Sequence, residues 1–146
     1  MRAGVRTDIG RVRATNEDSY IFEPPRLLMV ADGMGGHVAG EVASNLATAD
    51  VKRYITENNG TMSPDRLLQQ AIAEANKSIY AMSRQKDACN GMGTTATATF
   101  FTADKVYWGH VGDSRIYIYK KTGDLIQLTQ DHSLVWELIR SGSLSK

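Results

Sequence analysis

The chain has 146 residues, about the length of one domain, and its 42% hydrophobic and 23% charged residues exclude wholesale disorder. The 17 basic and 16 acidic residues give a formal net charge of +1, so no basic excess predicts binding to nucleic acid or to an acidic membrane surface. Composition alone identifies no function.

The first third of the chain predicts extended segments followed by a long helix. Residues Val5–Ile9 and Ser19–Phe22 are predicted to be extended, and Leu27–Ala31 to be a buried strand. This strand leads into a glycine-rich turn, Asp32–His37, and a helix is expected over Ala39–Glu57. The apolar face of that helix consists of Ala43, Leu46, Ala47, Val51, Tyr54 and Ile55.

A second helix has a clear start signal. Ser63 is a suitable cap, and Pro64 suits the first helical position because its missing N–H costs nothing there. The helical pattern fades near Lys86, and Asp87–Met92 is predicted to be a loop. The apolar stripe of this helix consists of Leu68, Ala71, Ile72, Ala75, Ile79 and Met82.

The rest of the chain has mainly the composition of strands. Strands are predicted over Thr94–Thr102, Val106–Val111, Ile116–Lys120 and Leu125–Thr129, the last two joined by a turn at Thr122–Asp124. A short last helix is then expected, with Ser133 as its cap and Leu134, Leu138 and Ile139 as its apolar residues. Two amphipathic helices between strands indicate an α+β fold in which the helices cover a mainly antiparallel sheet. We expect residues 1–146 to form one unit without an internal boundary.

The sequence also predicts a cytoplasmic protein. Its first ten residues lack the apolar stretch of a secretory signal, and its longest apolar run, Leu27–Ala31, is far too short to cross a bilayer. The single cysteine, Cys89, allows no internal disulfide and fits a reducing compartment. Because no His or Asp is placed beside it by the sequence, a thiol nucleophile is not expected.

The glycine-rich segment Asp32–His37 is the first candidate site. An aspartate at a strand end, beside glycines, can be aimed at a ligand that the backbone approaches closely. The alternative is a tight turn in which Asp32 only accepts local backbone hydrogen bonds. The loop could also hold phosphate at a helix N-terminus, but it lacks the Lys-Ser or Lys-Thr of a P-loop and the surroundings of a dinucleotide site.

Two further segments carry acidic residues beside an arginine. In Arg13–Ser19, side chains alternate, so Asp18 is expected to face the site while Glu17 supports it, and Arg13 has the fork geometry that fits a phosphate. The alternative is a solvated loop with an incidental Arg–Glu pair. In Gly109–Arg115, Asp113 lies at a break between two strands, and the alternative there is a turn aspartate beside a structural arginine.

Other polar positions are interpreted as structural. His110 and His132 are isolated in the sequence, and Gly91–Thr95 is expected to serve close packing before a strand. The three carboxylates of Asp18, Asp32 and Asp113, without clustered Cys or His, favour a Mg²⁺ or Mn²⁺ site over structural zinc. An arginine beside metal-binding aspartates indicates phosphoryl chemistry, because carboxylates alone would repel a phosphate.

These segments, in this order, resemble the metal-dependent protein phosphatases of type 2C in their bacterial form. The resemblance covers essentially the whole chain, and several ordered motifs are far more specific than one glycine loop. The segments that carry it are RATNEDS (13–19), VADGMGGH (30–37) with Gly40-Glu41, Gly93-Thr94-Thr95, VGDSRIY (111–117) and LTQDHS (128–133).

The resemblance implies a sandwich of two mainly antiparallel sheets flanked by helices. It also implies hydrolysis of phosphoserine and phosphothreonine in proteins by a water activated at a two-metal Mn²⁺ or Mg²⁺ centre. In the implied site Asp32 bridges the metals and the Gly33 carbonyl binds one, Asp18 and Glu17 are acidic ligands, Asp113 binds a third metal, Arg13 holds the phosphate, and His37 protonates the leaving group.

The sequence departs from the family after the LTQDHS segment. Family catalytic domains continue to an Asp-Gly and an Asp-Asn motif that supply further metal-binding aspartates, and neither follows here. We therefore expect residues 1–146 to be the N-terminal part of one catalytic domain, weakly active or inactive, with open sheet edges that allow a strand-exchanged dimer. The alternative function is a non-catalytic module that binds phosphoproteins or other partners; a phosphoprotein substrate and a cognate kinase are the partners that the resemblance implies.

Overall fold

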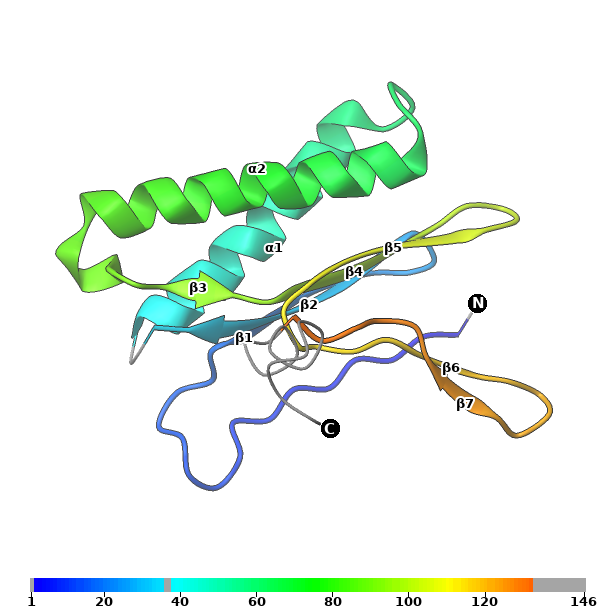
Figure 1. Cartoon of the computed structure of the whole chain (residues 1–146), viewed down its shortest axis with the longest axis horizontal. Coiled ribbons are helices and arrows are strands. Elements are labelled where there is room, and N and C mark those ends of the chain that lie inside the picture. The colour runs from blue at the N-terminus through cyan, green and yellow to red at the C-terminus, as the bar shows by residue number, and fades with distance from the viewer. Residues whose placement is uncertain (1, 36–37, 133–146) are drawn as a thin grey trace, which may run out of the picture.

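The structure, a computed structural model, describes residues 2–35 and 38–132. Within these residues, a five-stranded antiparallel sheet carries two long helices on one face (Figure 1). A two-stranded hairpin lies on the other side of the sheet (Figure 1). This is the α+β arrangement predicted from the sequence.

The main sheet has the strand order β1-β2-β4-β5, and β3 pairs with the end of β2. The strands are β1 (Asp18–Glu23), β2 (Leu27–Met34), β3 (Gly93–Thr94), β4 (Ala96–Phe101) and β5 (Val106–Val111). The segment Val5–Ile9, predicted to be extended, joins no sheet within the described residues, and Val5 and Ile9 are exposed. A strand needs a backbone partner, which alternation in a sequence does not reveal.

The two helices are α1 (Val38–Asn58) and α2 (Pro64–Gln85), close to their predicted bounds. Ser63 occupies the cap position of α2 with extended backbone angles, but its side chain makes no capping hydrogen bond. The predicted loop after α2 contains a short 3-10 helix, η1 (Asp87–Cys89). The helical periodicity therefore predicts the lengths of the two helices well, but it does not predict the hydrogen bonds at their ends.

The core lies between the helices and the sheet. Along β2, alternate residues Leu27, Met29 and Ala31 are buried, which places them on the face that the helices cover. Small residues on α1 allow close approach to this face, and full burial of each large aliphatic side chain contributes roughly 1.5–3 kcal/mol. The buried helix residues include Ala43, Ala47, Val51 and Ile55 of α1 and Leu67, Leu68, Ala71, Ala75 and Ile79 of α2.

The hairpin consists of β6 (Tyr117–Tyr119) and β7 (Leu125–Gln127), both shorter than predicted. Gly123 in its turn has a φ of 95°, a left-handed conformation that favours glycine. The predicted last helix after Ser133 lies outside the described residues. Among the helices that the structure describes, none combines the length and the apolar character needed to cross a membrane.

Candidate metal and phosphate site

Two aspartates face each other at one end of the sheet. Asp18 begins β1 and Asp32 lies near the end of β2, and the antiparallel register makes them Cα partners. Residues directly opposite in such a pair project from the same face, so the two carboxylates share the face away from the helices. Both residues are exposed, whereas the neighbouring Ala31 is buried. The register therefore brings together two acids that lie 14 residues apart in the sequence.

The electrostatic environment of Asp32 is strongly acidic. Partial burial raises the pKa of its carboxyl, and the negative charges of Asp18 and Asp113 raise it further. The positive charge of Arg13 opposes these effects, while Glu17 adds to them. All four charged residues predicted for the site thus lie within electrostatic range of Asp32.

Gly33 lies where β2 meets the start of α1. Its backbone N–H donates to the Glu17 carbonyl at 3.1 Å. A Cβ on Gly33 would lie 2.0 Å from the Gly40 carbonyl oxygen and 2.7 Å from that of Glu17. Only glycine permits these three backbone segments to approach so closely. The close approach fixes the position of the backbone next to Asp32.

Glu17 points away from the Asp18–Asp32 face. Its side chain is 10% exposed, and its Oε2 pairs with Arg13 Nη1 at 3.3 Å. A Cβ on Gly40 would lie 2.8 Å from the same Oε2, so the carboxylate packs against the start of α1. Arg13 itself is 71% exposed, which leaves most of its fork accessible. Asp18 and Glu17 therefore lie on different sides of the chain, as the alternation of side chains predicts.

Asp113 lies in the loop after β5. The preceding residue, Gly112, has a φ of 104°, and its carbonyl accepts a hydrogen bond of 2.7 Å from the His132 backbone N–H. On the other side, the Ser114 hydroxyl lies 2.8 Å from the Thr95 hydroxyl. The backbone on both sides of Asp113 is therefore tied to other parts of the chain.

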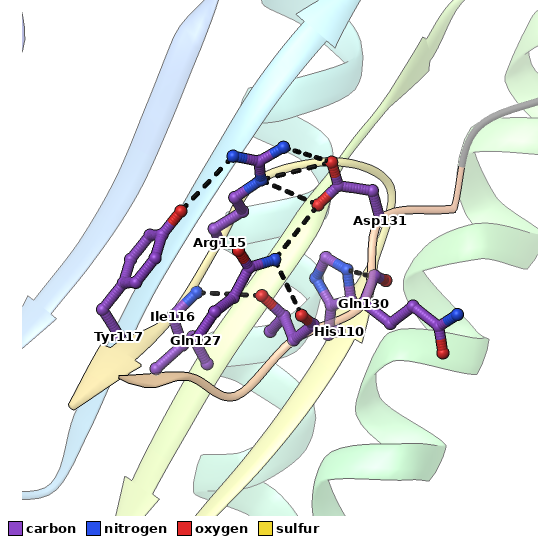
Figure 2. Close-up of polar contacts among 8 residues, drawn as sticks. His110, Arg115, Ile116, Tyr117, Gln127, Gln130 and Asp131 are labelled. Atoms are coloured by element: carbon purple, nitrogen blue, oxygen red, sulfur yellow. Dashed lines mark hydrogen bonds and ion pairs between the residues drawn. The ribbon is translucent and has the colours of Figure 1, made fainter. Parts of the chain in front are cut away.

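Figure 2 shows a second anchor of the same loop, formed by Arg115 and Asp131. Arg115 Nη2 and Nε reach the Asp131 carboxylate at 2.6 and 2.8 Å, and Asp131 is 14% exposed. Tyr117 accepts from the guanidinium and Gln127 approaches the carboxylate. The pairing raises the pKa of Arg115 and lowers that of Asp131, so both groups stay charged.

The histidines of this region make structural contacts. His110 Nδ1 lies 2.9 Å from the Thr97 hydroxyl and Nε2 lies 3.2 Å from the Gln130 carbonyl (Figure 2 shows the latter contact). The His110 and His132 rings lie 4.9 Å apart. His37, predicted to act on the leaving group, lies outside the described residues. Cys89 is buried.

The carboxylate oxygens at this end of the sheet are donor atoms of the type that hard divalent cations prefer. A cavity of about 230 Å³ is lined by Asp18 and Asp32 together with Val5, Arg6, Thr7, Ser19, Tyr20, Val30, Ala31 and Ser114. Partial burial and, after it, the negative charges of Asp18 and Asp113 raise the pKa of Asp32, and a bound cation would offset both effects. Among residues 2–35 and 38–132, however, no group of three or more His, Cys, Asp or Glu is arranged to hold a metal ion. Within the described residues, this end of the sheet therefore brings together a pair of acidic side chains, Asp18 and Asp32.

Sequence reasoning missed the part played by Thr95 and Ser114. Thr95 was assigned only to a packing segment, and its Oγ1 accepts a hydrogen bond of 2.9 Å from the Asp32 backbone N–H. A Cβ on Gly93, in the same segment, would lie 2.9 Å from the Met34 methyl, the end of an exposed side chain that can move aside. Thr95 and Ser114 both belong to motifs that carry the family resemblance, Gly93-Thr94-Thr95 and VGDSRIY. Membership of a motif was the available signal, but it does not indicate that the two side chains contact each other.

Comparison with known proteins decides the family. Residues 12–136 of the chain match the family described as "Protein phosphatase 2C". The chain belongs to the protein phosphatase 2C family. It is 42% identical over 153 residues to the serine/threonine phosphatase stp of Listeria monocytogenes, a match that covers 100% of the chain and 60% of that relative.

Solved structures of family members have the same fold. The serine/threonine phosphatase PstP/Ppp of Mycobacterium tuberculosis matches with a TM-score of 0.82 and 41% identity, over 95% of this chain and 58% of that one. The catalytic domain of PstP in complex with two manganese ions matches with a TM-score of 0.83 and 40% identity, over 96% of this chain and 60% of that one. The chain thus spans about 60% of the length of these relatives, and the predicted fold and family are confirmed.

Proposed function

We propose that this protein phosphatase 2C chain provides the Arg13, Asp18, Asp32 and Asp113 part of a site that hydrolyses phosphoserine and phosphothreonine in proteins. The observation that carries the proposal is the pairing of Asp18 with Asp32 across neighbouring strands, with Asp113 near enough to raise the pKa of Asp32. The names of its relatives, serine/threonine phosphatases, support the substrate class. We further propose that residues 1–146 are one part of a single catalytic domain.

In this proposal the acidic residues at this end of the sheet hold Mn²⁺ or Mg²⁺. Asp32 and the Gly33 carbonyl are the central ligands, Asp18 is an adjacent acidic ligand, and Asp113 serves a third, separate cation. A manganese pair is present in the PstP catalytic domain that this chain resembles, which supports the choice of metal. Bound divalent cations would supply an activated water and stabilise charge on the phosphoryl oxygens.

Arg13 is proposed to bind the phosphate of the substrate. Its guanidinium is largely exposed and near Asp32, and its planar fork suits two phosphate oxygens. Glu17, an acidic ligand in the sequence prediction, contacts Arg13 Nη1 through its carboxylate and so restrains the guanidinium. The assignment of the leaving-group proton donor to His37 stays a prediction from the resemblance.

The partners follow from this chemistry. A phosphoprotein is the proposed substrate, and a serine/threonine kinase that produces it is the proposed counterpart enzyme. A strand-exchanged dimer is the proposed assembly, because β1 and β5 end the main sheet in the described part of the chain and Trp108 of β5 is 48% exposed.

A second candidate function is a non-catalytic module that binds phosphoproteins. It is favoured by one observation: the described residues hold no cluster of three or more metal-binding side chains. Such a module would use Arg13 to bind phosphate and would need no divalent cation for that binding. The two functions therefore differ in their dependence on metal.

The test is Mn²⁺-dependent hydrolysis of p-nitrophenyl phosphate and of a phosphothreonine peptide by this chain. Asp32→Asn removes the central ligand, and Glu74→Gln, on the exposed side of α2, is the matched control. Hydrolysis that requires Mn²⁺ and is lost in Asp32→Asn but not in Glu74→Gln would support the phosphatase. Metal-independent binding of the phosphopeptide without turnover would support the binding module instead.

A further inference from the structure

Thr95 lies directly opposite Asp32 in the sheet. The pairing of β2 with β3 and the pairing of β2 with β4 share one register, and this register places Asp32 across from Thr95. The predicted strand Thr94–Thr102 is nevertheless interrupted at Thr95, between β3 and β4. The interruption is a local departure from regular strand pairing at the position opposite Asp32.

The side chain of Thr95 takes part in this departure. In a regular antiparallel pair, the Asp32 N–H would donate to the Thr95 carbonyl, and the Thr95 N–H would donate to the Asp32 carbonyl. The second bond is present at 2.9 Å, but the Asp32 N–H donates to Thr95 Oγ1 instead, also at 2.9 Å. The Thr95 carbonyl accepts from the Thr94 hydroxyl at 3.0 Å. A side-chain hydroxyl thus replaces a backbone acceptor beside Asp32.

The same hydroxyl reaches the loop that carries Asp113. Thr95 Oγ1 lies 2.8 Å from the Ser114 hydroxyl, on the C-terminal side of Asp113. On the N-terminal side, a Cβ on Gly112 would lie 2.6 Å from Thr95 Cγ2 and 2.8 Å from its Cβ. One side chain therefore contacts the residues on both sides of Asp113 and the backbone of Asp32.

We propose that Thr95 is a positioning residue that fixes the distance between Asp32 and Asp113 through its hydroxyl. This inference rests on the proposed function for its meaning, since it concerns two acids assigned to metal binding. Valine has nearly the shape of threonine and pairs equally well in a sheet, so packing alone does not require the hydroxyl. The hydroxyl is required for two hydrogen bonds, one with the Asp32 backbone and one with Ser114 beside Asp113.

The experiment compares Thr95→Val, Thr95→Ser and Ser114→Ala in the full chain, with folding checked by circular dichroism. The first readout is amide hydrogen exchange in the metal-free chain. In Thr95→Val the Asp32 amide loses its acceptor and is expected to exchange about tenfold faster, whereas Thr95→Ser keeps the wild-type rate. The Asp113 amide resonance is expected to shift in Thr95→Val, because this variant cannot contact the Ser114 hydroxyl through a hydrogen bond.

The second readout is Mn²⁺ affinity, measured by titration calorimetry. Outer hydrogen-bond partners of metal ligands typically contribute about 10- to 100-fold in affinity, so Thr95→Val is expected to lose that much and Thr95→Ser to recover it. Ser114→Ala cuts the link to the Asp113 loop while keeping the Asp32 bond, and a loss of affinity is expected there too. This variant keeps the test decisive if Thr95→Val does not fold.

Some results would overturn the inference. Wild-type Asp32 exchange in Thr95→Val, an equal defect in Thr95→Ser, or an unchanged Asp113 resonance in Thr95→Val would show that the hydroxyl does not couple the two segments. Asp32→Asn separates this failure from failure of the proposed function. If Asp32→Asn binds Mn²⁺ as wild type does, or if wild type binds none, the metal site is wrong, and the exchange and resonance data alone decide the role of Thr95.

Discussion

Asp18 and Asp32 are Cα partners on adjacent antiparallel strands, so two carboxylates project from one face at one end of the sheet. A folded chain gains nothing from this placement by itself, since like charges directly opposite each other destabilise a strand pair. The raised pKa of Asp32 reflects partial burial first and this repulsion second. The arrangement is costly to the metal-free protein, as expected of residues that serve binding.

Replacing Asp32 tests that cost and the metal site together. A raised carboxyl pKa means that the folded state disfavours the charged form, so above this pKa the charged side chain lowers the free energy of unfolding. Asp32→Asn is therefore expected to stabilise the metal-free chain at neutral pH, by about 0.2–1 kcal/mol for each exposed like-charge contact removed. It is also expected to abolish the rise in Tm that Mn²⁺ produces in wild type.

Thermal unfolding followed by circular dichroism, with and without Mn²⁺, measures both effects. Glu74→Gln, on the exposed part of α2, is the control and is expected to keep the metal response. An Asp32→Asn chain that Mn²⁺ stabilises as much as wild type would rule out Asp32 as a central ligand.

The sequence predicted the layers of this fold well and some of the site geometry. Most residues of the predicted apolar stripes of α1 and α2 are buried, because periodicity reflects which face a helix buries; Leu67, which is also buried, was not predicted, and Leu46, Tyr54, Ile72 and Met82 are only partly buried. Strand alternation also predicted that Asp18 and Glu17 point to different sides. The Asp18–Asp32 pairing itself depends on register, which one isolated strand pattern does not determine.

Thr95 illustrates what sequence reasoning could not reach. Its hydroxyl replaces its own carbonyl as the acceptor for Asp32, and this exchange depends on a local rotamer and on the approach of Ser114. A threonine in a β-rich segment looks the same whether it packs or links two loops. Similarly, nothing in the pattern of Val5–Ile9 indicated the absence of a strand partner in the described residues.

Arg13 is predicted to hold phosphate independently of metal binding. Arg13→Ala removes charge-assisted hydrogen bonds of about 1.5–3 kcal/mol, equivalent to a roughly 10- to 100-fold weaker affinity for inorganic phosphate. Glu17→Gln weakens the contact that restrains Arg13, so a smaller loss is expected there. Calorimetric titration with phosphate in the presence of Mn²⁺, and separately with Mn²⁺, measures the two affinities. An equal loss of both in Arg13→Ala would make Arg13 a structural residue.

Gly33 is predicted to tolerate no side chain. In Gly33→Ala the new Cβ would lie 2.0 Å from the Gly40 carbonyl oxygen, so the start of α1 must move away from β2. Such overpacking typically costs about 1–3 kcal/mol or more of unfolding free energy. Urea unfolding measures this cost. Gly4→Ala, where a Cβ meets nothing within 4 Å, is the control and should stay within about 0.5 kcal/mol of wild type. Equal midpoints for the two variants would show that the close approach at Gly33 is unimportant.

The Arg115–Asp131 pair predicts a specific acid dependence of stability. Arg115 lowers the pKa of Asp131 below its ordinary value of 3.8, so the carboxylate binds protons less readily in the folded than in the unfolded chain. The pair therefore contributes fully to stability above pH 3.8, and this contribution falls as the pH drops through the lower, folded pKa. Asp131→Asn lacks the titrating group and is expected to be less stable near neutral pH, with a shallower loss of stability in acid.

The measurement is the Tm of wild type and variant from neutral pH down to below the ordinary pKa of aspartate. Asp124→Asn, in the β6–β7 turn, removes a carboxylate from the same hairpin without touching the pair, and it is expected to keep the wild-type slope. The Tm curves of wild type and Asp131→Asn should converge in acid, because the protonated carboxyl can no longer pair with Arg115 as an ion. Curves that stay parallel over the whole range would mean that the pair does not stabilise the loop that carries Asp113.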